Sequence, residues 1–358
     1  MTLSVLALSR YDRRGASSRV RFYAYKGPLE RAGITVTPAP FFDGAYLDAL
    51  YAGRKVWRHA LRAYLRRLPA LLAARRHDLL WIEKELLPWL PIVVERLGIG
   101  GMPYVFDIDD AWYLRYREHR SALVRALCGD KLERMARGAT LAIVGNDTLA
   151  RWASESGARN VLALPSVVDV AHYQAPPPPE GPFTIGWIGT PQTAAYLWLI
   201  AAPLREFCRD RAARLLVIGA PAVTLDGVPI VHAPWREDTE AAMLARCHIG
   251  IMPLPDDEWS RGKCGYKLIQ YLASGRAVIA SPVGANKTIV RPGENGFLAA
   301  TDAEWRDAFA KLGGDPALCA RFGAAGRLLA ASEYSVSATV DPLAQALYRA
   351  AGRPVPPL

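Results

Sequence analysis

Short apolar runs alternate with longer amphipathic segments along most of the chain. Each apolar run predicts a buried β-strand, and the segments between the runs carry apolar residues at the three- and four-residue spacing of helices. Such regular alternation predicts an α/β fold with mainly parallel, doubly wound sheets. Strands are expected at residues 3–9, 34–39, 79–83, 103–109, 140–146, 161–166, 183–189, 214–220, 228–233, 248–255 and 276–284. Helices are expected at residues 91–97, 122–137, 193–209, 239–245 and 337–351, and another begins at Asp147.

A Pro-rich stretch at residues 175–182 divides the alternation into two halves. Such a run can join neither a sheet nor a helix, and it behaves as a stiff spacer. We therefore predict a first domain at residues 1–174, a second at residues 183–335, and a terminal helix at residues 336–351. In doubly wound sheets ligands bind beyond the carboxyl ends of the strands, so the loops that follow strands are where chemistry is expected.

The overall composition is that of a globular protein. The 358 residues suit two domains, and 51% hydrophobic with 22% charged residues exclude a mainly disordered, collagen-like or coiled-coil chain. No apolar run approaches the about 18 residues of a membrane-spanning helix, and the apolar-then-basic N-terminus is the reverse of a secretory signal, so we expect a cytoplasmic protein. Five dispersed Cys residues predict neither a disulfide framework nor a zinc site.

Most of the net charge of +10 comes from one segment. Residues 49–77 hold eight Lys and Arg residues and no Asp or Glu. Their spacing predicts a helix with Trp57 on an apolar stripe and Arg58, Arg62 and Arg66 on a basic one, interrupted or kinked after that by a proline. Such a helix suits an anionic membrane surface, whereas the alternative is a solvated charged face over an ordinary core stripe. Nucleic acid is a weaker alternative, because no RRM, KH or helix-turn-helix signature accompanies the patch.

Two loops after predicted strands could receive a phosphate. Gly15, Ala16 and Arg19 open a helix after the first strand, where small residues let a ligand approach the backbone and a helix N-terminus attracts anions. Gly189 and Thr190 end the first strand of the second half and could present backbone N–H groups. Each loop is also consistent with an ordinary turn. Neither matches a GxGxxG or Walker pattern, which argues against a standard NAD or ATP site.

Carboxylates cluster where the strand at residues 103–109 ends. Asp107, Asp109 and Asp110 could hold a divalent metal, or one could accept hydrogen bonds from sugar hydroxyls while another caps the next helix. Asp107 and Asp109 point to the same side of an extended strand, so they form the stronger functional pair.

The densest group of candidates lies at residues 256–296. Lys263, Gly265, Tyr266 and Lys267 lie at the predicted start of a helix, where the helix dipole, free N–H groups and two cations together favour a diphosphate.

The segment YLASGRAVIASPVGANKTIVRPGENGFLAA in this region resembles the donor-binding half of glycosyltransferase family 4, the retaining sugar transferases with the GT-B fold. GASSRVRFY, VFDIDDAWY, LAIVGNDTLARWA, VLALPSVVDVAHY and IGWIGTP resemble further segments of its bacterial members. The resemblance implies two Rossmann-like domains that face an interdomain cleft, with the nucleotide sugar bound by the second domain and the acceptor by the first. It also implies a terminal helix that crosses back onto the first domain, and no metal, cofactor or protein nucleophile.

The resemblance implies roles for the candidate residues. Lys263 and Lys267 stabilise the leaving diphosphate, helped by the two glycine loops, while Asp107 or Asp109 orients sugar or acceptor hydroxyls. The family's Arg and Lys after the strand at residues 183–189 are missing here, so the two lysines supply that positive charge.

Two positions stand at the family's E-x7-E motif. Gln270 replaces the second Glu and can hydrogen-bond a ribose hydroxyl through its amide. Gly262 replaces the first Glu and offers no side chain to the donor hexose.

We therefore expect an enzyme that moves a hexosyl-type sugar from a UDP- or GDP-linked donor to a hydroxyl of a lipid-linked or polysaccharide acceptor, with retention, in surface glycan or glycolipid biosynthesis. The basic helix indicates peripheral contact with an anionic membrane. The missing first Glu leaves open a catalytically degenerate nucleotide-sugar- or glycan-binding protein. A nucleic-acid-binding module rests on net charge alone, and an NAD enzyme lacks its glycine motif.

Overall fold

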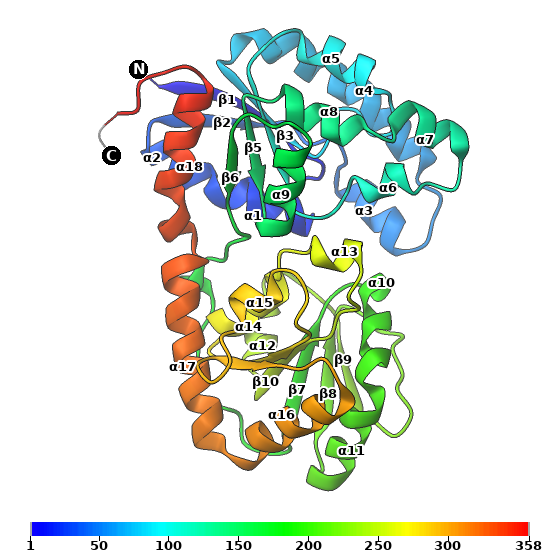
Figure 1. The fold of residues 1–358 in the computed structure, drawn as a ribbon, viewed down its shortest axis with the longest axis vertical. Helices are drawn as coiled ribbons and strands as arrows, with labels where there is room; N and C mark the ends of the chain where they lie inside the picture. Colours follow the sequence, from blue (N-terminus) through cyan, green and yellow to red (C-terminus); the bar gives the residue numbers. More distant parts are fainter. Residues whose placement is uncertain (1, 357–358) are drawn as a thin grey trace. The chain divides into compact units, whose positions relative to one another are not determined.

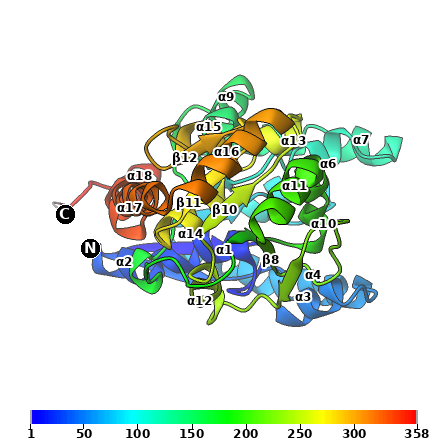
Figure 2. The same ribbon diagram turned by 90° about the horizontal axis from the view of Figure 1, so that it is seen from below.

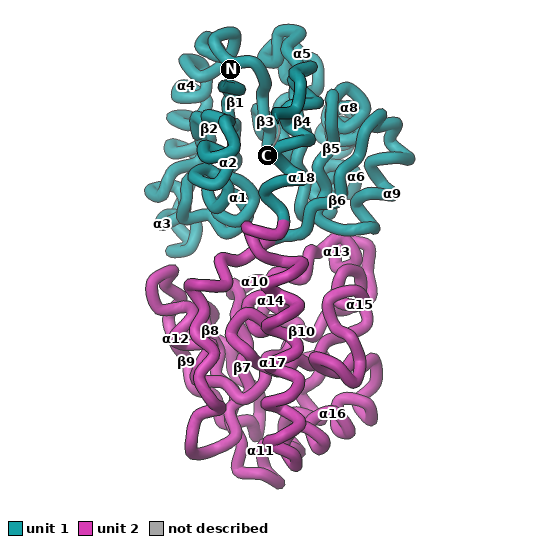
Figure 3. Tube along the Cα trace, turned by 90° about the vertical axis from the view of Figure 1, so that its left-hand side faces the viewer, with its two compact units in different colours: residues 1–166, 339–358 teal, residues 167–338 magenta. Residues whose placement is uncertain are grey.

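The computed structural model describes residues 2–356, which form two compact α/β units (Figure 1). The first unit contains the described residues up to Ser166 together with those from Thr339 onward, and the second contains Val167–Ala338 (Figure 3). The Pro-rich stretch at residues 175–182 forms neither helix nor strand, as predicted, and it belongs to the second unit.

Six parallel strands form the sheet of the first unit, in the order β2-β1-β3-β4-β5-β6. Strand β2 lies on one side of β1 and strand β3 on the other, so the strand order reverses between β1 and β3. The strands are β1 (Leu3–Leu8), β2 (Ile34–Pro38), β3 (Leu79–Glu83), β4 (Tyr104–Ile108), β5 (Leu141–Val144) and β6 (Val161–Ala163).

The helices of the first unit depart from the predicted ones at two places. Residues 122–137 form two helices rather than one, because the chain turns at Gly129 and Asp130. Helix α4 continues through Pro69, which is exposed, so that water can bond the carbonyl group that this proline leaves without a donor. The helices are α1 (Ala16–Arg21), α2 (Lys26–Arg31), α3 (Gly44–Tyr51), α4 (Trp57–Ala73), α5 (Ile92–Ile99), α6 (Leu114–Arg117), α7 (Ala122–Cys128), α8 (Lys131–Gly138), α9 (Asp147–Glu155) and the terminal α18 (Val336–Ala350).

The terminal helix α18 is joined to the first unit by hydrogen bonds. The hydroxyl groups of Tyr25 and Thr339 are 2.8 Å apart, and the Tyr348 hydroxyl donates to the carbonyl groups of Ala32 and Gly33 at 3.2 and 3.1 Å. The last helix of the sequence therefore completes the unit that the first strands begin.

The sheet of the second unit repeats this architecture, in the order β12-β11-β10-β7-β8-β9. All pairs are parallel, and the order reverses between β7 and β10, where Gly186 lies opposite Gly250. The strands are β7 (Thr184–Ile188), β8 (Arg214–Ile218), β9 (Ile230–Ala233), β10 (Ile249–Met252), β11 (Ala277–Ala280) and β12 (Gly296–Leu298).

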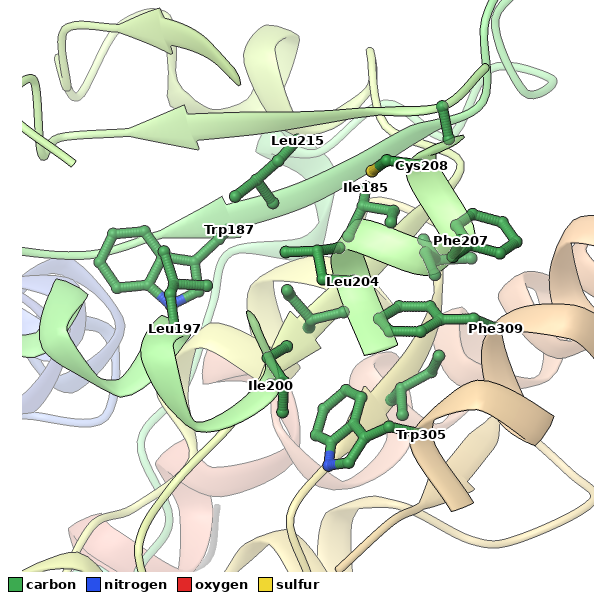
Figure 4. Packing of buried hydrophobic residues seen from close by; sticks show 14 of the residues in the cluster. Ile185, Trp187, Leu197, Ile200, Leu204, Phe207, Cys208, Leu215, Trp305 and Phe309 are labelled. Carbon is green, nitrogen blue, oxygen red and sulfur yellow. The ribbon is translucent and has the colours of Figure 1, made fainter. Parts of the chain in front are cut away.

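Helices cover both faces of the second sheet (Figure 2). Phe207 stacks on Phe309 at 5.3 Å over one face, in the same cluster as Trp187 (Figure 4), while Leu268 and Leu329 pack on the other. The helix expected at residues 193–209 is instead α10, a 3₁₀ segment at Ala195–Ile200, and α11. The helices are α10 (Pro191–Ala194), α11 (Ala201–Arg211), α12 (Glu240–Leu244), α13 (Glu258–Arg261), α14 (Tyr266–Ala273), α15 (Asn286–Ile289), α16 (Asp302–Gly314) and α17 (Pro316–Glu333).

A close backbone contact fixes α17 against the turn between α14 and β11. A Cβ atom at Gly323 would overlap the carbonyl oxygen of Gly275, and this backbone cannot yield as a flexible side chain can. We therefore expect Gly323→Ala to lower the free energy of unfolding by about 1–3 kcal/mol, measured by urea denaturation. Gly314→Ala is the matched control, because its Cβ would meet only the end of Arg211 at 3.5 Å. Equal midpoints for the two variants would contradict this packing.

Candidate functional site

The loops after β7 and β10 leave the second sheet where its strand order reverses. Gly189 and Thr190 directly follow β7, and the chain from β10 reaches Lys263 through the short helix α13 before α14 begins. In open parallel sheets this reversal is the place where ligands bind, because the two connections diverge there. The structure therefore brings the predicted phosphate-binding residues of this unit to one edge of one sheet.

Lys267, in the first turn of α14, reaches the loop that follows β7. Its Nζ atom lies 4.2 Å from the centroid of the Trp187 ring and 3.4 Å from Thr193 Oγ1. A Cβ atom at Gly189 would lie 2.6 Å from this nitrogen, so the close approach requires glycine there. Within residues 2–356, Lys267 forms no ion pair with a carboxylate.

The start of α14 concentrates positive charge. Burial, together with the charge of Lys263, lowers the pKa of Lys267 from 10.5 to about 7. Gly265 precedes the helix with φ +67°, and a Cβ atom there would overlap the side chain of Ile289. Tyr266 then begins the helix, whose N-terminal N–H groups and dipole favour an anion. A bound diphosphate would relieve the repulsion between the two lysines.

Gln270 lies in the next turn of α14 and takes part in a buried hydrogen-bond network. Its Nε2 is 3.4 Å from the hydroxyl of Tyr173, which donates to Glu240 Oε1 at 2.6 Å. Trp235, after β9, donates from Nε1 to the other oxygen of Glu240 at 2.6 Å. The network links α14, the start of α12 and the loop after β9. Gly262, which stands at the family's first Glu, is buried at the end of α13.

A second group of polar residues gathers at the carboxyl edge of the first sheet, where the strand order of that unit reverses. Lys84 follows β3 and pairs with Asp109, which follows β4, at 2.8 Å. Ser17 Oγ in α1 lies 2.5 Å from Asp109 Oδ2 and 2.8 Å from Glu83 Oε1. Gly15 caps this short helix, so the first predicted loop contributes to the same edge.

Lys84 has a backbone conformation that is rare for a residue with a side chain, with φ +62°. Burial lowers its pKa, but Asp109 and Glu83 outweigh that effect, and the net shift is upward. Burial alone would raise the pKa of Asp109, but the positive charges of Lys84 and Arg21 hold it below its usual value. Both groups of the pair are therefore charged. Strained backbone at a ligand-binding edge is typical of functional sites.

A further ion network lies directly after Lys84. Glu85 accepts from Arg10 at 2.7 Å and from Lys131 at 2.9 Å, and the Tyr116 hydroxyl donates to it at 2.6 Å. Burial would raise the pKa of Glu85, but Lys131 and Arg10 lower it to about 2. Lys131 also pairs with Glu95 at 2.8 Å. Sequence reasoning missed this network because its members come from separate elements and no motif joins them.

Asp107 and Asp109, which were expected to act as a pair, have different partners. Asp107 accepts from Arg21 Nε at 2.9 Å and from Trp81 Nε1 at 3.1 Å, and it is fully buried. Burial raises its pKa to about 6 although Arg21 opposes this shift. Asp109 lies closer to the surface, with 8% of its area exposed. Arg19, which was expected at the phosphate loop, is buried in α1.

Among residues 2–356, no group of three His, Cys, Asp or Glu side chains is arranged to hold a metal ion. The carboxylates of Asp107 and Asp109 face Arg and Lys side chains instead.

The four residues that were predicted to contact a membrane all belong to α4 and are exposed. Trp57 is 59% exposed, with the Arg58 guanidinium 5.2 Å from its ring centroid, and Arg62 is exposed. Arg66 is engaged within the unit, because it pairs with Asp43 at 2.7 Å. Within the described part of the chain, no helix is both long and apolar enough to cross a bilayer.

Comparisons with known proteins agree with this architecture. Residues 182–315 match the family model described as "Glycosyl transferases group 1". Comparison with curated protein sequences gives no significant match. Among solved structures, HepE from Anabaena in complex with UDP-glucose is similar with a TM-score of 0.72 at 15% identity, over 97% of this chain and 100% of that chain.

Two further structures are similar over nearly the whole chain. Sucrose-phosphate synthase from Thermosynechococcus elongatus has a TM-score of 0.69 at 15% identity, and a glycosyltransferase from Rickettsia africae has 0.68 at 10%, each covering 98% of both chains. The chain therefore has the GT-B fold, with two Rossmann-like domains. Together with the family match, this supports a place in the glycosyltransferase superfamily.

The lowered pKa of Lys267 makes stability depend on pH. Between about pH 7 and its ordinary pKa of 10.5, the unfolded chain holds a proton that the folded chain does not, so stability rises with pH. We expect Lys267→Met to be more stable than the wild type near pH 7, and this difference to shrink toward higher pH by at most about 1.4 kcal/mol per pH unit. Denaturation at several pH values measures it. Lys287→Met, at an exposed site on α15, is the control, and parallel curves for the wild type and Lys267→Met would contradict the prediction.

Proposed function

We propose that this protein is a retaining, hexosyl-type glycosyltransferase of family 4. It moves a sugar from a UDP- or GDP-linked donor to a hydroxyl group of a lipid-linked or polysaccharide acceptor, on the cytoplasmic side, in surface glycan or glycolipid biosynthesis. The observation that carries the proposal is Lys267, which lies beside Gly189 at the strand reversal of the second unit and near enough to Lys263 for the charge of Lys263 to lower its pKa.

In this proposal the second unit binds the donor. Lys263, Lys267 and the N–H groups that begin α14 face the diphosphate and stabilise the negative charge that develops as it leaves. Cations and helix dipoles fixed in advance act strongly on such charge, because they need not reorganise during the reaction. Gly189 and Thr190 bring backbone close to the same group, and Gln270 reaches a ribose hydroxyl.

The acceptor is assigned to the first unit. Asp109 is the better candidate for orienting an acceptor hydroxyl, because Asp107 is fully buried against Arg21 and Trp81. Lys84 and Ser17 hold the Asp109 carboxylate ionised and in one position. A donor phosphate oxygen takes the proton of the acceptor hydroxyl, so that the reaction needs neither a protein nucleophile nor a metal ion.

Nucleotide binding is the first prediction of this proposal. Thermal unfolding is measured with UDP, GDP, ADP and their sugars, each with and without EDTA. A ligand at 100 times its Kd adds about 2.7 kcal/mol, which raises the Tm by several degrees. We expect one nucleotide family to give this shift, unaffected by EDTA. A shift that EDTA abolishes would contradict metal-independent binding, and no shift with any nucleotide would contradict the donor site.

Lys263 provides a kinetic prediction. With the nucleotide sugar identified by the binding measurement, we expect Lys263→Ala to lower kcat about 100- to 1000-fold, because it removes charge that stabilises the leaving diphosphate. The Tm without ligand should stay within about a degree of the wild type. Lys287→Ala, an exposed lysine of the same unit, is the matched control and should leave kcat unchanged. Equal turnover for the two variants would remove Lys263 from this role.

A catalytically degenerate nucleotide-sugar- or glycan-binding protein is the second candidate. It is favoured by Gly262, which offers no side chain at the position of the family's first Glu. Nucleotide-induced stabilisation with no transfer to any lipid or glycan acceptor would support it over the enzyme. For the enzyme, NMR of the product should show the anomeric configuration of the donor retained.

A further inference from the structure

Helix α4 turns its large apolar side chains away from the core of the first unit. Ala63 and Arg67 are its buried residues. Trp57 and four leucines are exposed instead, and their spacing of three or four residues places them along one side of the helix. These leucines are Leu61, Leu65, Leu68 and Leu72, the last 84% exposed. The stripe that periodicity assigns to a core or a membrane is therefore outside this unit's core.

Helix α5 is the neighbour of α4 (Figure 1), and its exposed residues extend this apolar surface. Val93 is exposed, and Leu97 is 76% exposed. The two helices are adjacent, because a Cβ atom at Gly98 of α5 would lie 3.4 Å from Leu71 of α4. We call the large exposed apolar side chains of both helices the apolar face. The apolar face consists of Trp57, Leu61, Leu65, Leu68, Leu72, Val93 and Leu97.

The loop before α5 carries a partly exposed tryptophan in a strained conformation. Trp89 has φ +66°, and its backbone N–H group donates to the Tyr116 hydroxyl at 2.9 Å. The Arg115 guanidinium lies 4.9 Å from its ring centroid, as Arg58 lies beside Trp57. The Trp89 ring packs edge-on against Tyr116, with the ring centroids 5.2 Å apart, and it is 40% exposed. Trp side chains with a cation nearby are favoured where hydrocarbon meets lipid headgroups.

Cations that form no ion pair within the described residues flank the apolar face. Residues 49–77 contain no acidic residue. Within residues 2–356, the exposed cations of this segment that form no ion pair are Arg54, Lys55, Arg58, Arg62, Arg75 and Arg76. By helical position, Arg58 and Arg62 border the leucine stripe on the side away from α5. A partner for this surface must therefore offer hydrocarbon to the centre and negative charge to the border.

We propose that the apolar face inserts into the headgroup region of an anionic lipid bilayer, with hydrocarbon burial adding to the attraction of the flanking cations. The proposal rests on the proposed function and deepens it, since it names the surface that would meet a lipid-linked acceptor. A bilayer accepts leucines below its headgroups and cations among them. A second copy of the chain fits less well, because residues 49–77 of that copy would offer no acidic side chain to these cations.

The position of the apolar face suits such an acceptor. One loop, residues 84–91, begins with Lys84 at the Asp109 pair and contains Trp89 near α5. In α4, the Tyr64 hydroxyl donates to the carbonyl group of Pro88 in the same loop. An acceptor whose lipid stays in the bilayer would therefore meet the polar cluster of this unit a short way from the headgroups.

Vesicle flotation of the full chain tests the proposal. The vesicles are phosphatidylcholine alone, or phosphatidylcholine with about one third phosphatidylglycerol, at about 0.1 M and about 0.5 M salt. The apolar variant is Leu65→Ser with Leu68→Ser, and its matched control is Leu328→Ser, because Leu328 is 73% exposed on α17 of the other unit. The charge variant is Arg58→Gln with Arg62→Gln. All four replaced residues of these two variants are exposed, so the fold should tolerate them.

We expect the wild type and the Leu328→Ser control to float with anionic vesicles at low salt, and to retain part of this binding at high salt. The apolar variant should lose about tenfold or more in partition coefficient at both salt concentrations, since each leucine loses most of its transfer free energy. The charge variant should lose binding chiefly at low salt.

Three results would overturn the proposal: no flotation of the wild type at low salt, equal binding by the wild type and the apolar variant, or complete loss of wild-type binding at high salt. If the wild type does not bind vesicles but sediments as a dimer, and the apolar variant sediments as a monomer, the apolar face is instead the contact surface for a second copy. The nucleotide-induced rise in Tm should be the same in every variant. A failure of docking is thereby distinguished from a failure of the donor site.

Discussion

One side chain, Tyr271, ties the two strands that diverge at the reversal of the second sheet. Its hydroxyl accepts from the N–H group of Ile188 at 3.0 Å and donates to the carbonyl group of Ile251 at 3.4 Å, so it bonds β7 and β10 together. Gly250 permits this, because a Cβ atom there would overlap the Tyr271 ring. Tyr271 lies four residues after Lys267 on the same side of α14. The bonds that hold the two strands therefore also aim Lys267 at the loop after β7.

Two groups of buried charge, one in each unit, are compensated in different ways. In the first, Lys84, Glu85 and Lys131 each face opposite charges, and the pKa of each is shifted toward its ionised form. The charges of that cluster are neutralised by one another without a ligand, so the cluster holds the elements that carry them in fixed positions. In the second unit, Lys267 meets an aromatic ring and another lysine, and its pKa is shifted toward the neutral form. An anion would reverse that shift, which is the behaviour expected of a binding group.

The sequence patterns predicted eleven of the twelve strands that the described residues form, to within a few residues, because parallel strands that are buried on both faces form continuous apolar runs. The short strand β12 was missed, because its three residues form no apolar run of ordinary strand length. The glycine at the start of α14 and the two lysines beside it were also predicted, since they lie within one short segment. The Lys84–Asp109 pair and the network around Glu240 were not. Their members are joined by sheet order and by the packing of distant elements, which local spacing does not record. The break at Gly129 was missed because the apolar period continues across it.

Helix α4 shows why periodicity alone could not decide between core and surface. The pattern defines an apolar stripe but not the direction in which it points. That direction is set by Arg67, which donates to the carbonyl groups of Ala39 at 2.6 Å and Ser9 at 3.1 Å and lies 5.3 Å from the centroid of the Phe41 ring.

Burial lowers the pKa of Arg67 to about 9, which means that the charged guanidinium is destabilised there. Its hydrogen bonds to the carbonyl groups that follow β1 and β2 offset this cost. Turning the leucines inward would rotate this guanidinium away. The Ser9 carbonyl would keep the N–H group of Phe41 at 2.9 Å, but the Ala39 carbonyl would lose the Arg67 bond, at about 1–3 kcal/mol. The rotation would also break the bond between Arg66 and Asp43. The outward stripe is therefore held by specific polar contacts, and a helix fixed in this way can present the same apolar surface to a bilayer without refolding.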